Sequence, residues 1–218
     1  MGMDTRPLPL PCFDGLGESE LRALLDHAVL RTVPKNTIVV SEGDETDTVF
    51  FILSGRIKIY LSDAAGKEVV INIQGPGDYF GEMSLEPGGR SASVMTLETS
   101  RIGVVKMADF RAFLLRYPAF QLELVRKLIR RVRALTHHVR DLALLDVYGR
   151  VVRTLEDLAR QQDGRMIVPQ VMSQQAIANV VGASREMVSR ILKDLRVGGY
   201  IGIEDRRIVI LRKPPPAW

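Results

Sequence analysis

Six apolar residues recur at spacings of three and four between Pro118 and Leu145, which predicts a long helix with a narrow apolar row. The row is Val125, Leu128, Val132, Leu135, Val139 and Leu142. Two apolar positions in seven are the pattern of a two-stranded coiled coil, whereas a helix that packs only on its own domain usually carries a broader apolar face. Both interpretations remain open at this point, and the narrow row favours a partner helix.

Before this helix the pattern changes to short runs of β-branched and aromatic residues separated by glycine-containing turns. The predicted strands are Thr37–Val40, Thr48–Leu53, Arg56–Leu61, Glu68–Ile73, Ser91–Leu97 and Arg101–Val105. Closely spaced strands with no long helix between them predict an antiparallel β-roll of the jelly-roll kind. Helical spacing predicts short helices over Glu18–Val29 and Asp109–Arg116, and we expect residues up to Gly17 to form a loose arm.

After the long helix, the order of the predicted elements is that of a winged helix-turn-helix. These elements are a helix at Val147–Gln161, a strand at Met166–Val168, helices at Ser173–Val181 and Ser184–Val197, and a hairpin of Tyr200–Ile203 with Arg207–Leu211. The predicted fold class is therefore α+β in three parts. Residues 1–117 form a β-roll sensor domain, residues 118–145 a dimerisation helix, and residues 146–218 a DNA-binding domain.

The charge distribution agrees with a polyanionic partner for the last part. From Asp146 onward the chain has 12 Arg and Lys against 8 Asp and Glu, and the residues before it have 18 of each. The whole net charge of +4 thus lies in the predicted DNA-binding domain. No apolar run is long enough for a signal peptide or a membrane span, so we expect a cytoplasmic protein. A single cysteine, Cys12, and three scattered histidines predict no disulfide, metal site or haem.

One glycine-rich loop has the residue types of an anion site. Gly77-Asp78-Tyr79-Phe80-Gly81-Glu82-Met83-Ser84 is followed closely by Arg90-Ser91-Ala92. Glycines let a ligand approach the backbone, and the planar fork of Arg90 matches phosphate oxygens. Glu82 accepts hydrogen bonds and would suit a ribose hydroxyl. The spacing alone fits equally well a turn in which Glu82 and Arg90 only pair with each other.

The last predicted helix has one apolar face and one charged face. Val188, Ile191, Leu192 and Leu195 share the apolar face, and Arg185, Glu186, Ser189 and Arg190 share the opposite one. Arginine donates two hydrogen bonds to guanine, and glutamate accepts from cytosine, so this face suits the major groove of DNA. Ser173 and Ser184 are candidate helix caps, and with Gln174 they are candidate phosphate contacts. A solvated helix with a Glu186–Arg190 ion pair is the alternative.

These two motifs together resemble those of the CRP/FNR family of bacterial transcription regulators, especially its catabolite activator branch. The resemblance covers about Glu42 to Leu211. The cyclic-nucleotide cassette of that family matches Gly81, Glu82, Met83, Arg90, Ser91 and Ala92, and Ser84 follows within the same loop. The resemblance implies that Glu82 holds the ribose 2′-OH, and that Arg90 and Ser91 hold the cyclic phosphate. Asp146–Arg150 resembles the hinge between the long helix and the reader.

The long helix departs from the family at one position. Two consecutive hydroxyl residues contact the adenine there, and they match Leu135-Thr136 in this chain. Thr136 fits the pattern and Leu135 does not. The departure leaves the identity of the base open. Leu135 also belongs to the apolar row, where it would pack in the dimer.

The resemblance implies a homodimer that binds cyclic AMP (cAMP), reads palindromic TGTGA half-sites in double-stranded DNA and contacts RNA polymerase. The recognition motif Ser184-Arg185-Glu186 with Arg190 is complete. Alternatives within the family are a regulator that responds to cyclic GMP or cyclic di-GMP, or one that binds DNA without an effector. A remote alternative is an enzyme that processes cyclic nucleotides, although the sequence shows no catalytic metal cluster or nucleophile–base pair.

Overall fold

The computed structural model describes residues 13–169 and 171–215, so Cys12 lies outside the described residues. The chain divides into two compact units. The first comprises the chain up to Leu61 together with Val70–Arg130, and the second comprises Ser62–Val69 and the chain from Arg131 on. The helix α3, Pro118–Leu144, runs continuously across the boundary between them.

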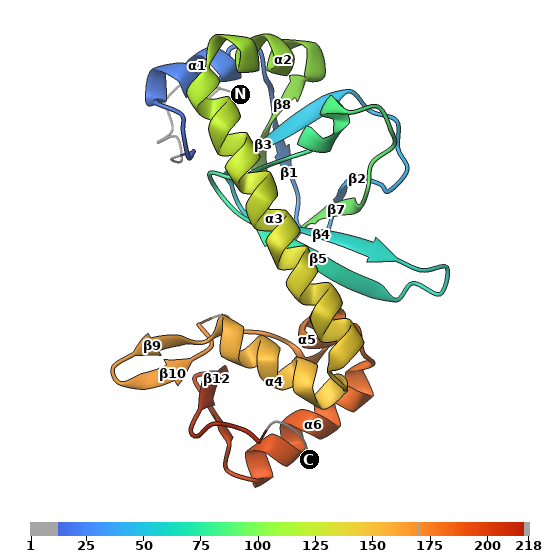
Figure 1. The fold of residues 1–218 in the computed structure, drawn as a ribbon, viewed down its shortest axis with the longest axis vertical. Helices are drawn as coiled ribbons and strands as arrows, with labels where there is room; N and C mark the ends of the chain where they lie inside the picture. Colours follow the sequence, from blue (N-terminus) through green and yellow to red (C-terminus); the bar gives the residue numbers. More distant parts are fainter. Residues whose placement is uncertain (1–12, 170, 216–218) are drawn as a thin grey trace, which may run out of the picture. The chain divides into compact units, whose positions relative to one another are not determined.

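The β-roll of the first unit consists of two four-stranded sheets, with the orders β1-β8-β3-β6 and β2-β7-β4-β5 (Figure 1). The strands are β1 (Val29–Val33), β2 (Ile38–Val40), β3 (Thr48–Ser54), β4 (Ile57–Ser62), β5 (Glu68–Gln74), β6 (Tyr79–Phe80), β7 (Ser93–Thr96) and β8 (Ser100–Lys106). Neighbouring strands are antiparallel, for instance β1 with β8 and β4 with β7. The predicted fold class is confirmed.

Strand β3 has four consecutive buried apolar residues because it has a core on each face. Side chains alternate along a strand, so Val49 and Phe51 pack with the helices while Phe50 and Ile52 pack inside the roll. The first of these two cores also holds the aromatic rings of Phe13, Tyr79, Phe110, Phe113 and Phe120.

Helices α1 and α2 and the first part of α3 belong to this unit, and two sequence predictions near them are wrong at least in part. Helix α1 spans Glu18–Leu25 and α2 spans Met107–Arg116. We expected the first helix to reach Val29, but Val29 begins β1 and pairs with Val104 of β8. We expected a loose arm up to Gly17. Residues 1–12 lie outside the described residues, and from Phe13 on the prediction is wrong, because Phe13 is buried in the core.

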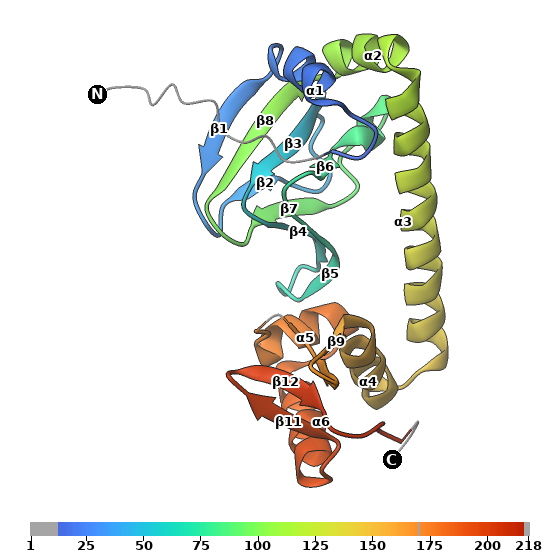
Figure 2. The ribbon, with the colours of Figure 1, turned by 90° about the vertical axis from the view of Figure 1, so that its left-hand side faces the viewer.

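The second unit contains the three helices and two hairpins of a winged helix-turn-helix (Figure 2). The elements are α4 (Val147–Leu158), β9 (Arg160–Gln162), β10 (Arg165–Ile167), α5 (Gln174–Val181), α6 (Arg185–Val197), β11 (Ile201–Glu204) and β12 (Arg207–Ile210). The prediction that α4 continues to Gln161 is wrong, because Gln161 pairs with Met166 in the β9–β10 hairpin. One apolar core holds Val151, Ile177, Val188 and Leu195 from the three helices.

The structure also changes the apolar row of α3. Leu128 packs against the core of its own unit, on the helix face that buries Phe120 and Leu124. The described part of α3 exposes Leu122, Val125, Ile129, Val132, Leu135, Val139, Leu142 and Leu144. Thr136 lies midway between Val132 and Val139 and continues the spacing of Leu122, Val125, Ile129 and Val132. Since a helix turns about 100° per residue, Leu135 shares the face of Leu128, seven residues earlier. The centre of the exposed row therefore passes through Ile129 and Thr136, and Leu128 and Leu135 lie at its edge.

Candidate functional site

The candidate cassette begins at a tight turn after β6. Gly81 has a φ angle of 86°, in the left-handed region, and it caps the short 3-10 helix η1, Glu82–Leu85. A Cβ atom on Gly81 would lie 2.8 Å from the Thr48 carbonyl oxygen, so only glycine fits without a shift. The turn directs Glu82 into the protein, where 3% of its surface is exposed.

The side chain of Arg90 is held on all of its nitrogen atoms. Nε donates to the hydroxyl of Thr46 at 2.6 Å, and Nη2 donates to the carbonyl and hydroxyl of Thr48 at 2.7 and 3.1 Å. Nη1 donates to the Gly81 carbonyl at 3.1 Å and to the Ser84 hydroxyl at 3.0 Å. Arg90 and Ser84, both predicted site residues, are thus brought together. Thr46 and Thr48 had no sequence signal, because they lie more than 40 residues away along the chain.

The backbone around Arg90 is fixed by the loop that precedes β3. Arg90 donates its N–H to the Asp44 carbonyl at 3.0 Å, and its own carbonyl accepts from Gly43 at 2.8 Å. These two bonds join the loop and the cassette like a short antiparallel pair. The guanidinium is therefore positioned from both the side chain and the main chain.

Burial dominates the electrostatics of this site. Only 7% of the Arg90 surface is exposed, and this loss of water lowers the pKa of its guanidinium. The carboxylates of Glu82, Asp44 and Asp47 act in the opposite direction and favour the charged form. The Phe50 ring lies 5.6 Å from the guanidinium carbon. The result is a cation in a desolvated pocket of oxygen acceptors, where an anionic ligand would interact more strongly than in water.

The remaining cassette residues lie nearer the surface. Met83 and Ser91 are exposed, and the Ser91 hydroxyl donates to the Met83 sulfur at 3.4 Å. Ala92 is half-buried. A buried cation, a buried carboxylate and an exposed hydroxyl thus lie within one loop system, and this set suits a phosphate ester with a neighbouring free hydroxyl group.

Leu135 and Thr136 are both exposed residues of α3, in the second unit. The Thr136 hydroxyl donates to the Val132 carbonyl one turn earlier, at 2.9 Å. The cassette belongs to the first unit, so a shared site with the cassette stays a prediction.

The charged face of α6 is open. Ser184 caps the helix by accepting from the Met187 N–H, and Ser173 caps α5 by accepting from the Ala176 N–H. Gln174 and the predicted base readers Arg185, Glu186 and Arg190 are exposed, and Ser189 is half-buried. In the described part of the chain no ion pair links Glu186 to Arg190, or either of them to another residue. The structure therefore gives no support to the alternative in which Glu186 and Arg190 pair with each other.

The hinge motif, Asp146–Arg150, contains a helix cap and an arginine that hydrogen-bonds to two other segments. Asp146 accepts from the Gly149 N–H at 2.7 Å and so begins α4. Arg150 donates to the carbonyls of Leu145 and Val181, each at 2.9 Å, and so joins the end of the long helix to the end of α5.

Residues 13–169 and 171–215 contain no group of three or more His, Cys, Asp or Glu that could hold a metal ion. Within the same residues, no helix is both long and apolar enough to cross a membrane.

This fold and these sites define a DNA-binding regulator with an effector domain. Residues 30–117 match the model of the cyclic nucleotide-binding domain, and residues 149–214 match that of the Crp-like helix-turn-helix domain. The chain belongs to the CRP/FNR family of transcription regulators.

Relatives support this assignment over nearly the whole chain. The chain is 34% identical to the CRP-like cAMP-activated global transcriptional regulator of Mycobacterium tuberculosis, over 91% of each protein. It is 36% identical to the cAMP-activated global transcriptional regulator Vfr of Pseudomonas aeruginosa, over 87% of this chain and 92% of that one. Its fold is similar to that of CLP, described as a c-di-GMP responsive global regulator of Xanthomonas campestris. The TM-score is 0.79, with 26% identity over 90% of this chain and 100% of CLP.

Proposed function

We propose that the protein is a homodimeric, cAMP-responsive transcription regulator that acts in the cytoplasm on palindromic TGTGA half-sites. Residues 1–117 would be the sensor, 118–145 the dimerisation helix and 146–218 the DNA reader. The observation that carries the proposal is the buried Arg90 close to the buried Glu82, in a loop with the family cassette. The cAMP-activated relatives named above support the choice of effector.

In this proposal the cyclic phosphate binds Arg90 and Ser91, and the ribose 2′-OH binds Glu82. The hydrogen bonds of Nη1 now go to two neutral oxygens, at Gly81 and Ser84. A phosphate that takes this nitrogen exchanges neutral acceptors for a charged one, and charge-assisted bonds are roughly twice as strong. Because Gly81 and Ser84 belong to the turn and to η1, the exchange reorganises that loop. Effector binding would therefore change the conformation of the turn and of η1.

The dimer rests on the exposed row of α3. Leu122, Val125, Ile129 and Val132 follow the spacing of three and four residues that pairs two helices, and Val139 lies one heptad after Val132. An apolar row of this length in water favours a partner surface, and a second copy supplies the same row. Two copies would set two α6 helices about 34 Å apart, one turn of DNA.

The DNA contacts follow from the open face of α6. Arg185 and Arg190 would each donate to guanine, and Glu186 would accept from cytosine. Ser173, Gln174 and Ser184 would contact phosphates at the amino-terminal ends of α5 and α6. By resemblance, the bound dimer would contact RNA polymerase.

The alternative effector is cyclic di-GMP, which one specific observation favours: the CLP relative is described as c-di-GMP responsive. Cyclic GMP, and DNA binding without an effector, are the other possibilities. Calorimetric titration with cAMP, cyclic GMP and cyclic di-GMP distinguishes these effectors, and DNA binding is measured with and without each of them. The proposal requires tight cAMP binding that raises affinity for the TGTGA palindrome. Incubation with cAMP followed by chromatography tests the remote enzyme alternative, which predicts turnover.

A further inference from the structure

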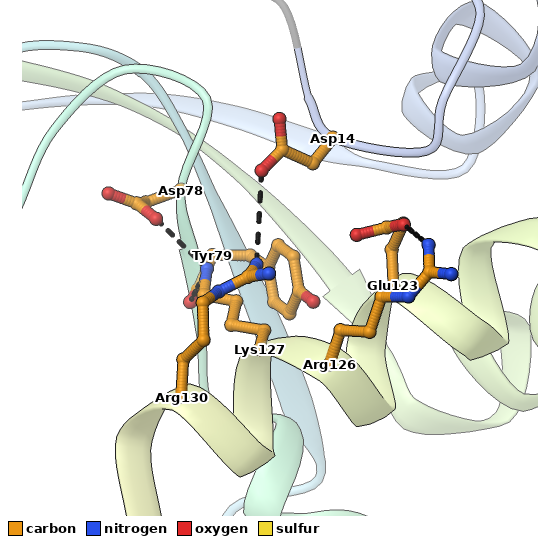
Figure 3. A network of polar contacts seen from close by, with 7 residues as sticks. All are labelled: Asp14, Asp78, Tyr79, Glu123, Arg126, Lys127 and Arg130. Atoms are coloured by element: carbon orange, nitrogen blue, oxygen red, sulfur yellow. Dashed lines mark hydrogen bonds and ion pairs between the residues drawn. The ribbon is translucent and has the colours of Figure 1, made fainter. Parts of the chain in front are cut away.

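Lys127 connects the long helix to the strand that precedes the cassette (Figure 3). Its Nζ atom lies 3.0 Å from Oδ1 of Asp78 and 3.4 Å from the carbonyl oxygen of Tyr79. The same atom lies 3.7 Å from the centre of the Tyr79 ring. Only 16% of the lysine side chain is exposed, so the charge is largely withdrawn from water. The carboxylate, the carbonyl and the aromatic ring together fix the position of this ammonium group.

The neighbouring cations of α3 do not make this connection. Arg126 pairs with Glu123 of its own helix, and Arg130 lies 3.9 Å from Asp14 with both side chains largely exposed. Lys127 and Arg130 line a pocket of about 250 Å³ together with Asp78 and Asp14. The pocket's charges pair with one another, so it offers no clear excess of one sign to a ligand. The residues that line the pocket instead hold α3 against Asp78 and Tyr79.

Strand β6 has only two residues, and they face different cores. Tyr79 packs with Phe51 and Phe120 on the helix side, at ring distances of 5.6 and 5.5 Å. Phe80 stacks on Phe50 inside the roll, at 4.7 Å and an angle of 5° between the rings. Because the two side chains lie on opposite faces of one short strand, a displacement at Tyr79 is transmitted to Phe80.

The cassette follows directly from Phe80. Gly81 is the next residue, and its carbonyl accepts from Arg90. The Phe50 ring, on which Phe80 stacks, also lies beneath the Arg90 guanidinium. The path from Lys127 to Arg90 is therefore a sequence of direct contacts through one strand. No part of it involves a residue matched to the family cassette until Gly81.

We propose that Lys127 is a positioning residue that couples the effector cassette to α3. It holds β6 to the helix, so that the reorganisation of Gly81 and η1 on effector binding moves α3 instead of being absorbed in the loop. This inference rests on the proposed function. The hydrogen bonds that hold Lys127 go to Asp78 and Tyr79, which precede the cassette, so we assign Lys127 to transmission and not to binding the effector.

The test compares binding with coupling in the full-length protein. For Lys127→Met we expect cAMP affinity in the absence of DNA to change by less than about fivefold, while the cAMP-induced gain in DNA affinity falls by at least about fivefold. Lys127→Arg should restore the gain, because a guanidinium can pair with Asp78 and cover the Tyr79 ring. Arg126→Met is the matched control, since it removes a neighbouring cation that contacts only its own helix, and its gain should equal that of the wild type.

An unchanged gain in Lys127→Met, with the wild type responding, would overturn the inference alone. A loss of cAMP affinity greater than the stated limit would also overturn it, because Lys127 would then belong to the binding site. If the wild type itself binds no cAMP, or binds DNA equally with and without it, the proposed function fails first. Should Lys127→Met not fold, Asp78→Asn removes the same ion pair and must reduce the gain in the same way.

Discussion

Gly81 and Arg90 are in such close contact that the absence of a side chain at Gly81 makes room for the guanidinium. A Cβ atom at Gly81 would lie 2.7 Å from Nη1 of Arg90, closer than real Cβ contacts allow. The Gly81 carbonyl accepts from the same nitrogen at 3.1 Å. One residue thus supplies both the space and a hydrogen bond for the buried charge.

We therefore expect Gly81→Ala to weaken cAMP binding and to destabilise the first unit. The left-handed angle costs an alanine roughly 1–2 kcal/mol, and overpacking adds about 1–3 kcal/mol. Gly43→Ala is the matched control, because Gly43 belongs to the same unit, has a similar φ of 81° and has nothing within 4 Å of its Cβ position. Denaturant unfolding and calorimetry measure both effects. Equal losses in the two variants would show that only the backbone angle matters.

Arg90→Leu should abolish measurable cAMP binding and also lower the free energy of unfolding without the effector. The lost phosphate contact costs about 2–5 kcal/mol of affinity in a desolvated site. The half-buried carbonyls of Thr48 and Gly81 lose their side-chain donor, although Gly81 keeps the backbone N–H of Ser84. An acceptor left unsatisfied costs about 1–3 kcal/mol. Arg90→Lys keeps the charge but not the five donors, so we expect intermediate values. Wild-type affinity in Arg90→Leu would remove the cassette from the effector site.

Leu135→Thr should sharpen the preference for cAMP over cyclic GMP and leave the dimer intact. A second hydroxyl beside Thr136 supplies a hydrogen bond to the purine, worth about 0.5–1.5 kcal/mol. The dimer should loosen little, because Leu135, although 42% exposed, lies on the face of Leu128 at the edge of the exposed row. Val132→Thr is the contrasting variant, since 63% of Val132 is exposed in that row and a polar group there should weaken dimerisation. Titration of both nucleotides and analytical ultracentrifugation test this. A looser dimer in Leu135→Thr would return Leu135 to the interface.

Glu186→Ala should relax discrimination at one base pair of each half-site, by roughly 1–3 kcal/mol. Replacing Arg185 or Arg190 by alanine should weaken the TGTGA palindrome far more than random DNA of equal length. All three side chains are exposed and make no ion pair or hydrogen bond in the described structure, so their removal should leave folding unchanged. Binding measured on both kinds of DNA at one salt concentration decides the matter. Equal losses on both would show that the arginines contact phosphates only.

The sequence by itself determined the elements whose signals are local. Helix α6, its Ser184 cap and its two faces depend on spacings within one helix, and these were predicted with errors of a residue or less. The same holds for the main body of α3 and for most strands of the roll. Periodicity and capping act between residues a few positions apart, so they can be read without a fold.

Only the tertiary structure decided which partners meet across the chain. Strand β6 is too short for a pattern, and it exists because Phe50 and Phe51 pair with it. Thr48 holds Arg90 from 42 residues away. The apolar row of α3 looked continuous through Leu128, but the core of the first unit takes Leu128 and leaves Ile129 exposed. A helix has apolar residues on more than one face, and the face that is buried depends on what packs there.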